Sequence, residues 1–199
     1  MTKKQFVELF LLRFDKGFAQ KKATEIQEQA MEALLVEIMQ DVVVFNQKKL
    51  AVQSDEFDYL RNKTTREQIA FRSAYIFETL YFKDSSVLRL FKNNFVSFFA
   101  EITNESAKRH FGKILTDILK KDLIHFTENE QELLAQTVAS WAVAPHTRVV
   151  VQIWAFEILA LLQEKGKIDA ETIGYLLEIL TQNSTPAIKC RLKRWNKRL

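Results

Sequence analysis

Hydrophobic positions recur along the chain with a helical period, and one segment is apolar on every side. Residues 147–162 read Thr-Arg-Val-Val-Val-Gln-Ile-Trp-Ala-Phe-Glu-Ile-Leu-Ala-Leu-Leu. A helix that is apolar all round is either wrapped by other helices or spans a bilayer. Its most apolar part has only about fourteen residues and contains Gln152 and Glu157, whereas a spanning helix needs roughly twenty. We therefore predict a helix buried in protein.

The ends of this segment fit a helix of a water-exposed protein. Pro145 and Thr147 supply a start signal, and Gly166 supplies a stop. We expect Trp154 and Phe156, which lie in its middle, to belong to the core.

The first apolar run, residues 6–14, follows Lys3 and Lys4 as in a signal peptide. Glu8 and Arg13 interrupt that run, and no small-residue cleavage site follows it. The spacing instead predicts an amphipathic first helix.

A second helix is predicted from Thr24, whose spacing to Gln27 forms a capping box, towards Phe45. The pattern then degrades, so residues 46–63 are predicted to form the longest irregular connection. Such connections are disproportionately functional, although mobile linkers are also common.

Polar start signals predict the remaining helices. Thr64 and Glu67 form a capping box before a helix whose buried side carries Ile69, Ala70, Ala74, Ile76, Phe77 and Leu80. Further helices are predicted over residues 87–99, after Asn104, after Thr127, after Asp169 and after Thr185.

The polar breaks at Thr64, Asn104, Thr147 and Thr185 lie roughly forty residues apart, with two predicted helices per interval. This period resembles that of the HEAT/armadillo class of α-solenoids, over about residues 24–199. The usual proline of the first helix and the regular turn aspartate are absent. The resemblance implies a right-handed α-α superhelix of about four hairpins plus an N-terminal helix (residues 1–23), in one domain spanning 1–199. A compact, non-repetitive helical bundle is the alternative.

Composition supports the all-α class. The chain has 199 residues, 47% of them hydrophobic, but only four glycines and two prolines, too few for a turn-rich β-protein. A lone cysteine, Cys190, cannot form an internal disulfide and fits a reducing, cytoplasmic location.

Motifs for catalysis are missing from the sequence. It contains no glycine-rich phosphate loop, His-Glu-x-x-His, Gly-x-Ser-x-Gly, Cys-x-x-Cys or EF-hand loop. The signature loop of fumarase- and adenylosuccinate-lyase-type enzymes is also absent. We predict no catalytic residue, cofactor or metal. Weaker alternatives are a metal site shared by His110, His125 and His146 and a cation site at Asp55, Glu56 and Asp58.

Two acidic residues, Glu78 and Glu157, occupy otherwise apolar surroundings. An unpaired buried carboxylate is costly, so each is expected to have an arginine partner or to face a groove. Arg72, Arg109 or Arg148 could be that partner.

Positive charge concentrates at the C-terminal end. Residues 187–199 carry six cations and no acid against a net charge of +4, which leaves about −2 for the rest. The apolar face of this predicted helix is Ile188, Leu192, Trp195 and Leu199. The cations are either a solubilising cap on the last hairpin or a site for anions, and they are Lys189, Arg191, Lys193, Arg194, Lys197 and Arg198.

The HEAT-like resemblance implies a groove lined by the second helix of each hairpin, which suits peptides or helices. The candidate binding residues are Gln68, Arg72, Tyr75, Arg109, Lys113, Arg148 and Gln152. We predict a non-enzymatic protein-interaction module. The alternative is a nucleic-acid-binding or alkyl-base-excising HEAT-like protein with Tyr75 and Trp154 as stacking residues, although that family's catalytic residues do not map onto this chain. A third possibility is an enzyme without a recognisable motif.

Overall fold

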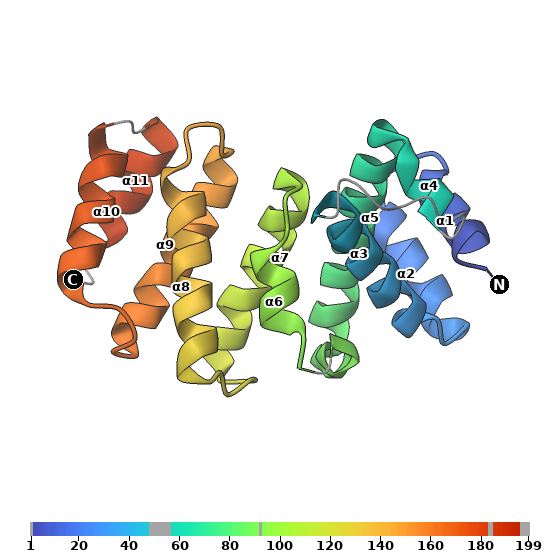
Figure 1. The fold of residues 1–199 in the computed structure, drawn as a ribbon, viewed down its shortest axis with the longest axis horizontal. Coiled ribbons are helices and arrows are strands. Elements are labelled where there is room, and N and C mark those ends of the chain that lie inside the picture. The colour runs from blue at the N-terminus through green and yellow to red at the C-terminus, as the bar shows by residue number, and fades with distance from the viewer. Residues whose placement is uncertain (1, 48–56, 92, 183–184, 196–199) are drawn as a thin grey trace. The chain divides into compact units, whose positions relative to one another are not determined.

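The computed structural model describes residues 2–47, 57–91, 93–182 and 185–195 (Figure 1). Every regular element in these ranges is a helix, with no strand among them, which confirms the all-α class. The chain divides into two compact units, unit 1 (Met1–His110) and unit 2 (Phe111–Leu199), and each is described by itself. The single-domain organisation of residues 1–199 stays a prediction.

Unit 1 is organised around α5 (Lys63–Lys83), on which the helices before it pack. Those helices are α1 (Lys3–Leu11), α2 (Phe18–Glu28), α3 (Glu32–Gln47) and α4 (Asp58–Arg61). After α5 come the 3₁₀ helix η2 (Ser85–Phe91), α6 (Phe95–Ala100) and the start of α7 (Glu105–Lys121). The six residues predicted for the buried side of α5 are all buried.

Unit 2 is built from hairpins. In Figure 1, α8 (Glu128–Val143) runs beside α9 (Val149–Glu164), and α10 (Ala170–Gln182) beside α11 (Pro186–Trp195). Helix α10 contacts both α8 and α9, and α11 contacts α9. The most apolar helix is therefore wrapped by its neighbours, as its sequence predicts.

Polar caps fix most helix starts in unit 2. Thr127 and Glu130 form the predicted capping box of α8, and the Asp169 carboxylate accepts the backbone N–H of Thr172 at 2.7 Å. Helix α9 begins one to two residues later than predicted, after Arg148, which makes no side-chain cap. Gly166 ends it in the left-handed conformation, at φ 68°.

The helix predicted from Thr24 is wrong, because Thr24 lies inside α2. That helix ends at Glu28, and Ala30 then takes a left-handed φ of 52°. The N–H of Met31 closes the turn on the Ile26 carbonyl at 2.9 Å, and α3 follows as a separate helix. The predicted N-terminal helix over residues 1–23 is likewise two segments, because α1 ends at Leu11.

Two other predictions in unit 1 need correction. Helix α5 is capped by Asn62, not Thr64, since the Asn62 side-chain oxygen accepts the N–H of Thr65 at 3.0 Å. The helix predicted over 87–99 is η2 followed by α6. The connection predicted over 46–63 is shortened by α3 and by α4, and its residues 48–56, with Asp55 and Glu56, lie outside the described residues.

The core prediction for α9 holds in part. Phe156 is buried, whereas Trp154 is only half-buried. A β-carbon on Gly112 of α7 would lie 2.9 Å from Trp154 Cβ, so the two helices approach closely there.

Among the helices of the described ranges, none is both long enough and apolar enough to cross a bilayer.

Candidate interaction surface

The predicted groove residues fall in both units. Gln68, Arg72 and Tyr75 share one face of α5 in unit 1, and Arg109 is exposed on α7 in the same unit. In unit 2, Lys113 lies on α7, and Arg148 and Gln152 lie at the start of α9. The structure therefore brings together the three residues of α5, and the groove itself stays a prediction.

Arg72 makes contacts inside unit 1 that tie down the end of α1. Its guanidinium donates hydrogen bonds to the backbone carbonyls of Phe10 and, at 2.7 Å, Leu12. The same group lies over the rings of Phe14 and Phe18, 5.3 and 5.5 Å from their centroids. Partial burial lowers the pKa of the Arg72 guanidinium, because desolvation disfavours its charge. Arg72 thus supports the connection between α1 and α2.

Gln152 and Arg148 also have local roles. The amide of Gln152 donates to the Ala142 carbonyl at 3.1 Å, which joins α9 to the end of α8. Arg148 is the N-cap residue of α9 and is exposed.

Aromatic rings cover the surface beside Arg72. Phe71 and Tyr75 stack on α5 with centroids 6.3 Å apart, and Phe14 lies 5.4 Å from Phe71. On the other side, the ring of His110 stacks on Tyr75 at 4.9 Å with an interplanar angle of 20°. These rings join the α1–α2 connection, α5 and α7 into one layer.

The histidine of this layer also belongs to a buried polar pair. His110 Nδ1 contacts the Glu78 carboxylate, and both residues are buried. His110 Nε2 has no hydrogen-bond partner within the described part of the chain. Glu78 thus has a histidine partner, and Glu157 pairs with Lys120 at 2.8 Å. An arginine partner or a groove-facing position for either carboxylate stays a prediction. The sequence indicates that Glu78 needs a partner, but nothing local identifies a residue 32 positions away.

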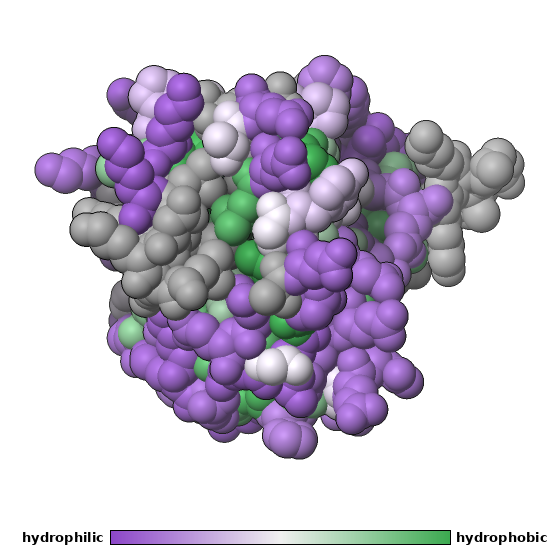
Figure 2. Space-filling view, turned by 90° about the vertical axis from the view of Figure 1, so that its left-hand side faces the viewer, coloured by the Kyte–Doolittle hydropathy of each residue, from purple (hydrophilic) through white to green (hydrophobic). Residues whose placement is uncertain are grey.

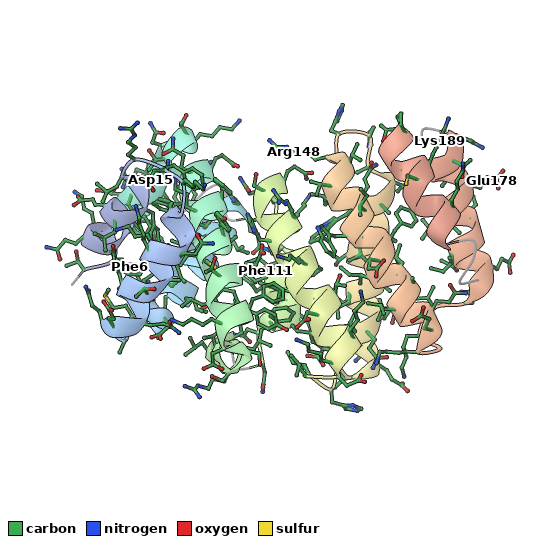
Figure 3. All side chains as sticks on the ribbon, turned by 180° about the vertical axis from the view of Figure 1, so that it is seen from behind. Phe6, Asp15, Phe111, Arg148, Glu178 and Lys189 are labelled. Atoms are coloured by element: carbon green, nitrogen blue, oxygen red, sulfur yellow. The ribbon has the colours of Figure 1, made fainter. Side chains whose placement is uncertain are left out.

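The connection between α1 and α2 exposes large apolar side chains. Leu11, Leu12 and Phe14 are 37%, 53% and 43% exposed, whereas other exposed large apolar residues, such as Leu133, are scattered. Figure 3 labels Asp15 in this connection. We call the set formed with the half-buried Phe71 and Tyr75 the Leu12 surface: Leu11, Leu12, Phe14, Phe71 and Tyr75. Sequence reasoning missed it, because residues 6–14 were assigned to one amphipathic helix.

The predicted basic patch is only partly visible. Lys189 and Lys193 are exposed on α11, and Ile188 is buried as predicted. The side chains of Arg191 and Arg194, and all of Lys197 and Arg198, lie outside the described residues. Figure 2 shows hydrophilic residues over most of the face that carries α10 and α11, with apolar side chains between them.

The metal alternatives gain no support from the geometry. Within the described residues no group of three or more His, Cys, Asp or Glu side chains could hold a metal ion. His110 is buried, and His125 and His146 are exposed.

A pocket of about 220 Å³ lies in unit 1 between the α2–α3 connection and η2. Asp84 at its edge accepts hydrogen bonds from the hydroxyl and backbone N–H of Ser86, and these bonds lower the pKa of its carboxyl group. Asp84 thus serves as a local cap of η2. The residues that line the pocket do not form a recognisable catalytic or ligand-binding group.

No family model matches the chain, and neither the curated proteins nor the solved structures include a match to it.

Proposed function

We propose that the protein is a non-enzymatic protein-interaction module and that the Leu12 surface is its binding surface in unit 1. The observation that carries this proposal is the exposure of three large apolar side chains, Leu11, Leu12 and Phe14, within four consecutive residues. A contiguous exposed apolar patch with polar residues around it is typical of a binding site. Aromatic residues and arginine, which are enriched in protein interfaces, both occur here.

The support under this surface favours binding with little ordering cost. Arg72 holds the carbonyls at the end of α1, and Phe14 packs against Phe18 and Phe71. A connection fixed by such contacts loses less conformational entropy when a partner binds than a mobile loop does.

A HEAT-like superhelix is part of the proposal. The short connections within α8–α9 and α10–α11 and the forty-residue spacing of polar breaks support it. In that architecture α5 is the second helix of a hairpin, so Tyr75 and Gln68 would line the concave side.

The second candidate is nucleic-acid binding or alkyl-base excision, which the six cations of residues 187–199 favour. Arg72, a candidate groove cation that could contact phosphate, binds carbonyls of its own chain. If this candidate is right, duplex affinity falls steeply between about 50 and 200 mM salt. Tight duplex binding should also survive the replacement of Lys193, Arg194, Lys197 and Arg198 by glutamine. The interaction module instead predicts weak, non-specific DNA binding that this replacement abolishes.

Site-specific photo-crosslinking tests the proposal directly. A photoreactive amino acid replaces Leu12 in one variant and Leu133, on α8, in the matched control, because Leu133 is also exposed, at 39%. In native lysate we expect a discrete protein adduct at position 12, competed by excess unmodified protein and absent at position 133. Equal adducts at both positions, or adducts to nucleic acid, would contradict the proposal.

A further inference from the structure

The charges around the Leu12 surface indicate the chemistry of its partner. Arg13 and Lys16 are exposed and lie on either side of Phe14 in the sequence. Neither cation has an ion-pair partner in the part of the chain that the structure describes. The acid between them, Asp15, is paired with Lys21 at 3.3 Å. The unpaired charges of this connection are therefore positive.

The positive charge around the Leu12 surface contrasts with the negative net charge of the segment that follows it. Residues 1–22 carry six cations and two acids, a net charge of +4, whereas residues 23–186 have a net charge of −6. The second acid of the segment, Glu8, is exposed on α1 one helical turn after the exposed Lys4. A basic segment on an otherwise acidic chain attracts anionic groups towards this end of unit 1.

We infer that the Leu12 surface binds an acidic peptide segment that carries a large apolar anchor residue. This inference rests on the proposed function and names its partner class. The anchor contacts Leu12, Phe14 and the edge of Tyr75, while its flanking carboxylates face Arg13 and Lys16. Opposite charges at the rim of such a contact speed association and set its orientation, while the buried apolar anchor supplies most of the affinity.

A bilayer fits these observations less well than a peptide does. Insertion requires apolar side chains that reach about 5–10 Å into the interface. Leu11 and Phe14 each keep more than half of their surface covered, and Phe14 is packed on Phe18 and Phe71. Side chains that are partly packed against their own protein suit a partner that approaches them.

The test begins with an unbiased probe, a displayed library of random twelve-residue peptides selected on the full chain. Peptides that also bind the Leu11→Ser/Leu12→Ser variant are removed, and circular dichroism checks that this variant is folded. We expect the remaining peptides to be rich in aspartate, glutamate and large apolar residues. Enrichment of lysine and arginine, or no enrichment at all, overturns the inference.

Charge reversal then tests the assigned cations. Fluorescence anisotropy with a labelled selected peptide should show about a tenfold or greater loss of affinity in Arg13→Glu/Lys16→Glu. The matched control Lys189→Glu/Lys193→Glu, which changes the same number of exposed cations on α11, should bind as the parent does. Equal losses in both variants overturn the inference, as does stronger binding to phosphatidylserine-containing vesicles than to the selected peptides.

The two proposals fail in different ways. If the position-12 protein adduct persists in Arg13→Glu/Lys16→Glu, the interaction module stands and the acidic partner is wrong. If no adduct forms at position 12 in the parent chain, the proposed function and the inference are both wrong.

Discussion

The two units build their cores from different side chains. Thirteen of the sixteen phenylalanines lie in residues 1–110, whereas all three tryptophans lie in residues 111–199. In unit 1 the rings meet edge to face, as Phe91 does with Phe77 and Phe95, at 87° and 89°. The buried positions of α9 in unit 2 are mostly aliphatic. Ring contacts are more directional than aliphatic ones, so unit 1 depends more on specific geometry.

Buried polar groups show the same contrast. In unit 2 the hydroxyls of Thr116 and Thr137 donate to carbonyls of their own helices, at 2.8 and 2.7 Å. In unit 1 Glu78 is satisfied by His110 of another helix. Thr116 and Thr137 are therefore satisfied within their own helices, whereas the contact of Glu78 with His110 forms only when α5 and α7 come together.

The largest expected effect compares one ring from each core. Phe91→Ala and Phe156→Ala should each lower the free energy of unfolding by about 3–5 kcal/mol, because each leaves a cavity. Phe91 should cost more, since its side chain is the more completely buried, 1% exposed against 7% for Phe156. Urea unfolding followed by circular dichroism measures both losses. A smaller loss for Phe91→Ala would break the contrast between the cores.

A double-mutant cycle on the buried pair comes next. Glu78→Leu or His110→Leu alone should destabilise unit 1 by roughly 3–5 kcal/mol, because each removes one member of a buried polar contact. The double variant should lose much less than the sum of the two. Thr116→Val, the control in unit 2, should cost about 1 kcal/mol. Additive single losses would show that the pair contributes no coupling.

The contact between α7 and α9 gives a smaller effect that is confined to unit 2. Gly112→Ala should destabilise the protein by about 1–3 kcal/mol, because its β-carbon would overlap Trp154. Gly174→Ala is the matched control, since no atom lies within 4 Å of the added carbon, and it should stabilise α10 by up to about 1 kcal/mol. Tryptophan fluorescence during denaturation measures both, because all the tryptophans lie in unit 2.

The smallest effect separates a real helix cap from a predicted one. Thr127→Ala should cost about 1 kcal/mol, because it removes the capping box of α8. Thr24→Ala should change the unfolding free energy by less than about 0.5 kcal/mol, because Thr24 is exposed within α2. The unfolding midpoints of the two variants decide the comparison, and a larger loss for Thr24→Ala would contradict the boundary of α2.

These comparisons explain where sequence patterns succeed. Thr127, Asn104 and Asp169 carry their own cap acceptors, so the starts of α8, α7 and α10 can be predicted from neighbouring residues. The break between α2 and α3 depends on a left-handed Ala30, a residue type that signals no turn. Its position is set by packing on α5, which no local pattern contains.

The candidate surface was predictable only in part. Gln68, Arg72 and Tyr75 do share a face of α5, because helical spacing requires it. The role of Arg72 was not predictable, since its acceptors are backbone carbonyls about sixty positions earlier in the chain. The exposure of Leu12 and Phe14 was not predicted for a related reason. These residues are exposed because α1 ends at Leu11, and Arg72 helps to fix that end.

The bond between Arg72 and the end of α1 has a consequence for synthesis on the ribosome. Helix α1 leaves the exit tunnel before α5, because the guanidinium that binds the carbonyls at its end is made about sixty residues later. With only nine residues, α1 is too short to be stable alone in water. The N-terminal segment therefore stays unfolded until α5 emerges, and its leucines and phenylalanines are open to chaperones throughout that interval.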